Sequence, residues 1–312
     1  MLTTIFLFLV GVVLLVYGAD SLVRGASALA EQFRIPKSVA GLTMVALGTS
    51  APELFVNVLA ALEGNTTFAL ANVSGSNLAN MCLGFGICGV IGGISISRHE
   101  FGWDLLAMVA SAVLVTTLFY TRSAGNLPFW AFIPLTILLV SFCYSLCSRP
   151  NFDEPDEQVS HSKVGISSLF LVAGSVALYF GAEMVLKSAI HVAGALKVGN
   201  DVVALTAVAL GTSVPDISAT VIAAKKKEFG IAVGNILGSN VSNIVLVLNS
   251  TLIAGGASLP ASRAVRADYL VVCLVSLFVC AVAFSVGRVT RQIGWAMVVG
   301  YLCYLLFRIA ML

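Results

Sequence analysis

The strongest constraint on the fold of this chain is an internal repeat at an offset of 163 residues. Residues 42–53 read LTMVALGTSAPE and residues 205–216 read LTAVALGTSVPD, so nine of the twelve positions are identical. Without a gap, the same offset pairs GSNLAN at residues 75–80 with GSNVSN at residues 238–243. A duplication of this length predicts two halves of the molecule that fold alike.

Each half consists mainly of apolar stretches that are long enough to cross a bilayer. The 312 residues are 59% hydrophobic and 10% charged, with a mean hydropathy of +1.00, which excludes an ordinary soluble domain. Stretches of about the 20 residues that a membrane helix needs lie at roughly 2–20, 36–62, 68–94, 103–120, 127–147, 164–186, 198–224, 229–257, 268–287 and 293–311. We therefore predict an all-α, polytopic membrane protein with ten transmembrane helices.

Each copy of the repeat contains five of these stretches, and this odd number determines how the halves are oriented. The second copy must enter the membrane with the opposite sense from the first, an arrangement known as inverted repeats. We expect a first five-helix repeat at residues 1–147 and a second at 164–312, joined by a cytoplasmic linker at 148–163. The linker is acidic and too short to be a domain, so a solvated connection is favoured over a calcium-binding regulatory loop.

Arginine and lysine residues predict the orientation of the chain, because they collect in cytoplasmic loops. Eleven of the seventeen lie on the side reached after the first helix and six on the opposite side, which places both termini outside. The basic run at residues 225–227 is too short to indicate nucleic acid. Membrane lipid is therefore expected around the protein, and no nucleic acid partner.

Glu53 and Asp216 are equivalent acids near the centre of their predicted membrane helices. A charged side chain at the centre of a bilayer costs about 2.5–3.5 kcal/mol, so both acids require a compensating partner. No lysine or arginine lies within one helical turn of either acid. The natural partner is a bound cation.

Proline next to each acid is expected to break the helix at that depth. Pro52 and Pro215 cannot donate a backbone hydrogen bond and clash with the preceding turn, and a glycine lies four residues before each. Backbone carbonyls freed there, which we assign to Ala46 and Ala209, can face a cation.

Hydroxyl and amide side chains accompany the acids in the same pattern in both halves. Residues four apart share a helical face, as Thr49 does with Glu53. The oxygen-bearing side chains predicted to surround the cation are Thr49, Ser50, Glu53, Ser76 and Asn80 in the first half and Thr212, Ser213, Asp216, Ser239 and Asn243 in the second. Without sulfur or imidazole, this set suits a hard cation such as calcium, which takes six to eight oxygens. Sodium can use the same oxygens.

Small polar residues also let membrane helices pack closely and hydrogen-bond to one another. That interpretation suffices for any single serine, threonine or asparagine here. It does not explain why a mid-membrane acid recurs at the same place in both halves. Function is therefore favoured for the two acids.

A second equivalent pair of acids lies nearer the helix ends. Asp20 precedes Arg24 by four residues, and Glu183 precedes Lys187 by four. Each acid can be neutralised within one helical turn. Interfacial salt bridges are therefore favoured over an ion relay.

The duplicated strings resemble the two alpha-repeats of the sodium/calcium exchangers in the calcium/cation antiporter superfamily, in their prokaryotic ten-helix form. The resemblance rests on residues 46–53 and 75–80 with their second copies, and extends over nearly the whole chain. It implies that the second, third, seventh and eighth helices hold one calcium or several sodium ions, and that the first and sixth helices slide as a pair. The ligands that it implies are the ten side chains given above.

Two positions set this chain apart within that resemblance. Archaeal exchangers carry glutamate in both repeats, whereas Asp216 here matches potassium-dependent exchangers, and its shorter side chain can alter ion preference. Potassium-dependent relatives have an aspartate where Asn243 stands, so this asparagine argues against potassium coupling. Asn243 carries more weight because the difference changes the formal charge.

The expected function is exchange of calcium for sodium across the plasma (inner) membrane, without a prosthetic group. Calcium/proton antiport is the closest alternative, because a carboxylate can bind a proton. A passive cation channel would share an acidic, oxygen-lined site, but a single central site in inverted repeats disfavours it. No constellation of nucleophile and base indicates an enzyme, and nothing in the sequence indicates an oligomeric state.

Overall fold

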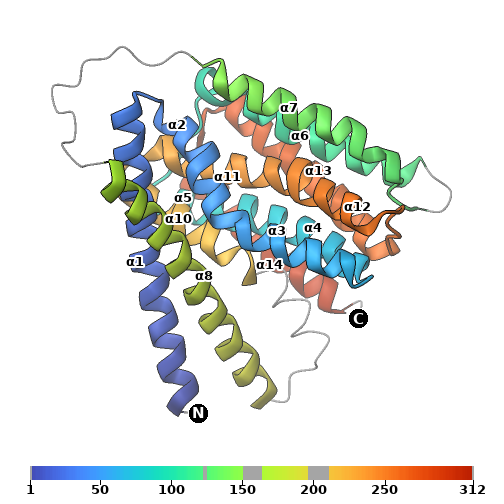
Figure 1. The fold of residues 1–312 in the computed structure, drawn as a ribbon, viewed down its shortest axis with the longest axis horizontal. Helices are drawn as coiled ribbons and strands as arrows, with labels where there is room; N and C mark the ends of the chain where they lie inside the picture. Colours follow the sequence, from blue (N-terminus) through green and yellow to red (C-terminus); the bar gives the residue numbers. More distant parts are fainter. Residues whose placement is uncertain (1, 122–124, 150–163, 196–210, 311–312) are drawn as a thin grey trace.

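The computed structural model describes residues 2–121, 125–149, 164–195 and 211–310, which are almost entirely helical (Figure 1). The first half consists of α1 (Leu2–Phe33), α2 (Lys37–Ala40), η1 (Gly41–Val45), α3 (Ala46–Leu62), α4 (Thr66–Ala79), η2 (Asn80–Phe85), α5 (Gly86–Ile91), β1 (Ile94–Ser95), α6 (Arg98–Tyr120), η3 (Phe129–Ala131) and α7 (Phe132–Cys147). The second half consists of α8 (Val164–Ala195), α10 (Val214–Lys225), α11 (Phe229–Ser242), η4 (Asn243–Leu248), α12 (Asn249–Gly255), α13 (Arg263–Ser285), β2 (Arg288–Val289) and α14 (Arg291–Ala310). η1, η2 and η4 are π-helical, and η3 is a 3₁₀ turn.

Nine helical segments within the described ranges are long and apolar enough to cross a membrane. The tenth predicted span, at 198–224, overlaps residues 196–210, which lie outside the described residues, and α10 is its described part. The prediction of an all-α membrane protein is confirmed.

The two halves repeat the same elements with boundaries displaced by 163 residues. α4 begins at Thr66 and α11 at Phe229, and the π-helical segments that follow begin at Asn80 and Asn243. Short pairings between loops join one repeat to the other at both ends of α6. β1 pairs antiparallel with β2 beyond one end, and Leu127 forms a bridge with Leu259 beyond the other.

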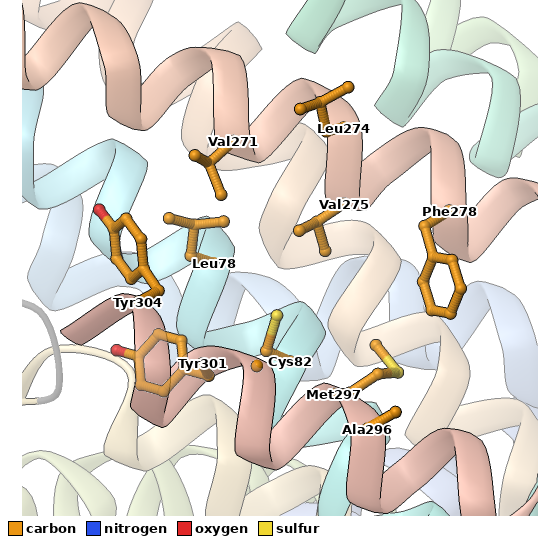
Figure 2. A pocket seen from close by; sticks show the side chains of 11 residues that line it. Leu78, Cys82, Val271, Leu274, Val275, Phe278, Ala296, Met297, Tyr301 and Tyr304 are labelled. Atoms are coloured by element: carbon orange, nitrogen blue, oxygen red, sulfur yellow. The ribbon is translucent and has the colours of Figure 1, made fainter. Parts of the chain in front are cut away.

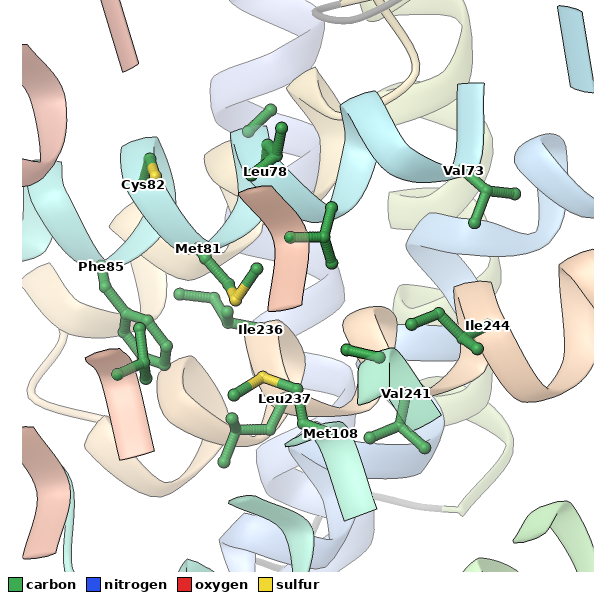
Figure 3. Packing of buried hydrophobic residues seen from close by; sticks show 14 of the residues in the cluster. Val73, Leu78, Met81, Cys82, Phe85, Met108, Ile236, Leu237, Val241 and Ile244 are labelled. Carbon is green, nitrogen blue, oxygen red and sulfur yellow. The ribbon is translucent and has the colours of Figure 1, made fainter. Parts of the chain in front are cut away.

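The helices that carry the repeated motifs form the centre of the molecule. In the span that contains α11, 94% of the most apolar window is buried, compared with 28% for α1 and 22% for α8. Figure 1 shows α1 and α8 packed against each other at one side of the remaining helices. Figure 3 shows apolar side chains of α4 and η2, among them Leu78 and Met81, facing Ile236 and Leu237 of α11. The motif helices are thus enclosed by apolar side chains.

Glycines allow the two motifs to meet backbone to backbone. A Cβ atom added to Gly41 would lie 2.6 Å from the carbonyl oxygen of Ile231, and one added to Gly238 would lie 2.8 Å from the Cβ of Ala46. Both distances are shorter than a van der Waals contact, so only glycine permits this approach. The close crossing places the GSN segment of the second repeat against the start of α3.

The helix that carries Glu53 is irregular, but not at the place that the sequence predicts. α3 continues from Ala46 to Leu62 with Pro52 inside it, so the predicted break at Pro52 is wrong. Proline removes only the hydrogen bond to the carbonyl four residues earlier, here that of Gly48 rather than Ala46. The irregular segment is η1, which ends directly before α3. In the second half the predicted break is present: Thr212 and Ser213 form a turn, and α10 begins directly after it, with Pro215 in its first turn, where a missing N–H group is tolerated.

Candidate functional site

Two buried carboxylates from opposite repeats meet at the centre of the protein. Glu53 lies on α3 and is 1% exposed, and Asp216 lies in the first turn of α10 and is 0% exposed. The two carboxylates are close enough for their charges to repel each other. Within the described part of the chain, neither carboxylate forms an ion pair with a lysine or arginine. A bound cation would supply the charge that is missing here.

The Asp216 carboxylate is surrounded by hydrogen-bond donors. The Asn80 amide nitrogen donates to Asp216 Oδ2 at 2.7 Å, and the Ser239 hydroxyl donates to Oδ1 at 2.9 Å. The Asn235 amide nitrogen also donates to the Asp216 backbone oxygen at 2.9 Å. Donors from both repeats therefore fix the side chain and the backbone of this residue.

The Glu53 carboxylate has a different environment. The hydroxyls of Ser50, Ser76 and Thr212 lie near it, but neither of its oxygens accepts a hydrogen bond of good geometry from any described residue. Its backbone oxygen accepts a hydrogen bond from the Asn57 amide at 2.8 Å. The carboxylate of the first half therefore remains open to a ligand.

Hydroxyl groups connect the two halves of the site. Ser76 Oγ and Thr212 Oγ1 are 2.9 Å apart, and Thr212 donates to Asn72 Oδ1 at 3.0 Å. Thr49 can donate to the backbone oxygens of Val45 at 3.0 Å and Ala46 at 3.2 Å. It also lies 3.3 Å from Asn235 Oδ1.

Most of the predicted site residues therefore lie together. Hydrogen bonds link Ser76 with Thr212 and join Asn80 and Ser239 to Asp216. Those that are buried at the positions expected are Thr49, Ser50, Glu53, Ser76, Asn80, Ser213, Asp216, Ser239 and Asn243. Thr212 is half-buried in the turn directly before α10, and Ala46 is buried at the junction of η1 and α3. Ala209 lies outside the described residues.

Two buried asparagines of this network were missed in the sequence. Asn72 and Asn235 are both 0% exposed, and they contact Thr212 and Asp216 respectively. Each lies four residues before the serine of the GSN motif, and the two are separated by 163 residues. Residues four apart share a helical face, so applying this spacing from Ser76 and Ser239 toward the N-terminus would have identified both asparagines.

The unpartnered oxygens indicate what the site can bind. Buried atoms without a hydrogen bond to any described residue include both carboxylate oxygens of Glu53, Ser50 Oγ, Asn80 Oδ1 and Asn243 Oδ1. No group of three or more His, Cys, Asp or Glu side chains that could hold a metal ion occurs in the described ranges. A cation bound by Glu53 and Asp216 would therefore take its other ligands from neutral oxygens. Two carboxylates among several neutral oxygens suit a hard cation such as Ca²⁺ or Na⁺.

A pocket of about 290 Å³ between α13, α14 and the α4–η2 segment differs from this site (Figure 2). It is lined by aliphatic, aromatic and sulfur-bearing side chains, among them Val275, Phe278 and Met297. An apolar lining cannot replace the hydration shell of an ion. The polar cluster of Glu53 and Asp216 is therefore the candidate ion site.

Comparison with known proteins supports the repeat and the fold. The profile of the family described as "Sodium/calcium exchanger protein" matches residues 3–147 and again residues 166–310. The second match begins 163 residues after the first, the same offset as the repeated motifs. The matches cover both halves almost completely.

Individual relatives agree with the profile. The chain is 30% identical over 298 residues to the putative antiporter CaxA of Alkalimonas amylolytica, covering 93% of this chain and 92% of the relative. It is 29% identical over 289 residues to the sodium/calcium exchanger MaX1 of Methanosarcina acetivorans, covering 80% and 82%. The structure of the sodium-calcium exchanger NCX_Mj superposes with a TM-score of 0.83 at 25% identity, covering 96% of this chain and 97% of that one. This chain therefore belongs to the sodium/calcium exchanger family.

Proposed function

We propose that the protein is a secondary active transporter that exchanges Ca²⁺ for Na⁺ by alternating access. The observation that carries the proposal is the meeting of Glu53 and Asp216, from opposite repeats, in one buried cluster of oxygens. A carboxylate pair inside a membrane protein requires a cation, and inverted repeats can expose one central site to either side in turn. Two relatives described as sodium/calcium exchangers support the choice of ions.

The proposed ligands are the side chains predicted from the repeat. Glu53 and Asp216 supply the negative charge, and the neutral oxygens come from Thr49, Ser50, Ser76, Asn80, Thr212, Ser213, Ser239 and Asn243. Backbone carbonyls of Ala46 and Ala209 are further candidates by position. Neutral oxygens favour Ca²⁺, which accepts an irregular shell, over Mg²⁺, which requires a tight octahedron.

At the stoichiometry of three Na⁺ for one Ca²⁺ that the family resemblance implies, exchange would be electrogenic. Two carboxylates neutralise one Ca²⁺, whereas three Na⁺ ions would leave one positive charge in excess. Each net charge moved across the membrane is worth about 2.3 kcal/mol per 100 mV. An inward sodium gradient and a membrane potential that is negative inside would therefore both drive Ca²⁺ out of the cell.

The placement in the membrane is also a proposal. The distribution of arginine and lysine puts both termini outside and the 148–163 linker in the cytoplasm, between repeats at 1–147 and 164–312. We place the protein in the plasma (inner) membrane of a prokaryotic cell, surrounded by lipid. No prosthetic group, nucleic acid partner or enzymatic activity is proposed.

Flux through reconstituted protein tests the function. Uptake of ⁴⁵Ca²⁺ into proteoliposomes loaded with Na⁺, at equal pH on both sides, is expected to exceed uptake without Na⁺ by at least about tenfold. The Glu53→Gln variant should reduce uptake to background, while Glu63→Gln, which removes an exposed acid from the end of the same helix, should retain it. Normal uptake by Glu53→Gln would refute the proposal.

Calcium/proton antiport remains the second candidate because the open Glu53 carboxylate can bind a proton in place of Na⁺. Uptake driven by a pH gradient in Na⁺-free buffer would favour it. Uptake without any counter-ion gradient would favour a passive channel instead.

A further inference from the structure

Asn72 and Asn235 form a symmetric pair of amides behind the ion site. Asn72 lies on α4 and Asn235 on α11, each one helical turn before the serine of its GSN motif. Both side chains are completely buried. Each amide oxygen faces a threonine of the opposite repeat, Asn72 facing Thr212 at 3.0 Å and Asn235 facing Thr49 at 3.3 Å.

The orientation of the Asn235 amide follows from its partners. Its nitrogen lies 2.9 Å from the Asp216 backbone oxygen, which can only accept a hydrogen bond, so the NH₂ group must point there. The same nitrogen donates to Thr220 Oγ1 at 2.9 Å. The amide oxygen is therefore the atom that faces Thr49.

A threonine hydroxyl has one hydrogen and two lone pairs. If its oxygen is to bind a cation, the hydrogen must point away from the ion and find an acceptor. The Asn72 oxygen provides this acceptor for Thr212, and the Asn235 oxygen provides one for Thr49. Groups of this kind, which orient the ligands of a metal without touching it, typically change metal affinity by about 10–100-fold when they are removed.

We propose that Asn72 and Asn235 are positioning residues of the ion site, which orient the lone pairs of Thr212 and Thr49 toward the cation. The proposal rests on the proposed function, because it assumes that these threonines bind the transported ion. Neither asparagine is itself a ligand in this arrangement. The pair places the acceptor for each repeat on the other repeat, so an ion would be held only when both repeats are correctly docked.

The two asparagines differ in how strongly the orientation of their threonines depends on them. Thr49 has two backbone carbonyls as alternative acceptors, so loss of the Asn235 oxygen matters less to its hydroxyl. The main effect of Asn235 is to hold the Asp216 backbone. The Thr212 hydroxyl also lies 2.9 Å from Ser76 Oγ, but the Asn72 nitrogen bonds to no described residue. Replacing Asn72 therefore removes the contact with Thr212 without disturbing the Asp216 backbone, so Asn72 is the better position at which to test the proposal.

A double-mutant cycle on Asn72 and Thr212 tests the proposal by equilibrium Ca²⁺ binding to the purified full chain in nanodiscs. Asn72→Leu and Thr212→Val are each expected to raise the Kd by about 10–100-fold. If Asn72 acts through Thr212, the Kd of the double variant should be no more than about twofold higher than that of whichever single variant binds Ca²⁺ more weakly. Independent, multiplicative effects would overturn the proposal. Where Asn72→Leu does not give folded protein, the smaller, polar Asn72→Ser replaces it in the cycle.

A matched control separates positioning from general stability. Asn249 is also buried and donates to Thr136 Oγ1 at 2.9 Å, between α12 and α7. Asn249→Leu should lower the melting temperature but leave the Kd for Ca²⁺ within about twofold of the wild type. A change in Kd as large as that of Asn72→Leu would overturn the inference. If the wild-type chain binds no Ca²⁺, the proposed function itself is refuted, whereas wild-type binding with an unchanged Kd in Asn72→Leu refutes this inference alone.

Discussion

The two halves of the proposed ion site contain the same kinds of side chain but differ in their hydrogen bonds. In the second half, Asp216 accepts hydrogen bonds from Asn80 and Ser239, and its backbone is fixed by Asn235. In the first half, both carboxylate oxygens of Glu53 lack a hydrogen bond to any described residue. Asn243, the equivalent of Asn80, has neither amide atom bonded within the described residues.

This difference suggests that the two carboxylates have different roles in binding a cation. The Asp216 half is satisfied before an ion arrives, so it can act as a preformed wall of the site. The Glu53 half carries a buried carboxyl group that no described residue donates to, which is costly to ionise until a cation binds. The difference between glutamate in one repeat and aspartate in the other therefore coincides with a difference in how the two carboxylates are hydrogen-bonded.

The largest expected effect comes from neutralising each acid in turn. Glu53→Gln and Asp216→Asn should each reduce exchange by at least about 100-fold, because a neutral partner cannot compensate the charge of a cation in the membrane. Their effects on the ion-free protein should differ. Asp216→Asn replaces the carboxylate that accepts from Asn80 and Ser239 by a neutral amide, which accepts weaker hydrogen bonds, and should cost about 1–3 kcal/mol of stability. Glu53→Gln removes a buried acid that no described residue donates to, and should stabilise the ion-free protein.

Thermal melting in chelator without Na⁺ checks this contrast. Added Ca²⁺ should raise the melting temperature of the wild type, since a ligand that binds only the folded state stabilises it. It should have no effect on either variant. Equal ion-free stability of Glu53→Gln and Asp216→Asn would remove the distinction between the two halves.

The next largest effect separates the two equivalent asparagines. Asn80→Leu leaves Asp216 Oδ2 without its 2.7 Å donor, so it should destabilise the ion-free protein by about 1–3 kcal/mol. Asn243→Leu breaks no hydrogen bond to a described residue and should leave ion-free stability nearly unchanged. Both should weaken Ca²⁺ binding, because both amide oxygens are proposed ligands. Melting curves with and without Ca²⁺ measure the two effects separately, and equal ion-free destabilisation would contradict the prediction.

A smaller effect is expected at the serines. Ser239→Ala removes one hydrogen bond to Asp216 and should cost about 0.5–1.5 kcal/mol in the ion-free state. Ser50 lies near both carboxylates, but its hydroxyl oxygen has no hydrogen-bond partner in the described ranges. Ser50→Ala should therefore lower Ca²⁺ affinity without a comparable loss of stability. An equal loss of stability in the two variants would indicate that Ser50 is structural.

The sequence predicts the membrane fold and the composition of the site because both are expressed in regular spacings. Ten apolar stretches and one offset of 163 are sufficient for the architecture, and four-residue spacing is sufficient to place Thr49 with Glu53 on one face. The same spacing reaches Asn72 and Asn235, so these could have been predicted.

The hydrogen-bond pattern could not be predicted in this way. Asn80 bonds to Asp216, whereas Asn243 bonds to no described residue. This contrast depends on how α10 and α11 pack against neighbouring helices, and the spacing of residues along one helix does not contain that information. The sequence also predicts a helix break at Pro52, whereas α3 continues through this residue. A proline removes one hydrogen bond, and whether the helix then breaks depends on the helices packed around it.

The smallest effect is expected at the outer pair of equivalent acids, where the predicted salt bridges are present in both halves. Asp20 bonds to Arg24 at 2.7 Å and Glu183 to Lys187 at 2.6 Å. Asp20 additionally contacts Lys226 at the end of α10, which ties α1 to the helix that carries Asp216. The ion pair of Glu183 with Lys187 lies within α8.

Asp20→Asn should therefore have a measurable effect where Glu183→Gln has none. Loss of an exposed or half-exposed ion pair costs about 0.2–1 kcal/mol, which is too little to unfold the protein but enough to shift an equilibrium between two arrangements of α1 by a few fold. If α1 and α8 slide during transport, breaking the Asp20–Lys226 contact should change the rate of exchange with little change in Ca²⁺ affinity. Equal rates for Asp20→Asn and Glu183→Gln would show that this contact does not restrain α1.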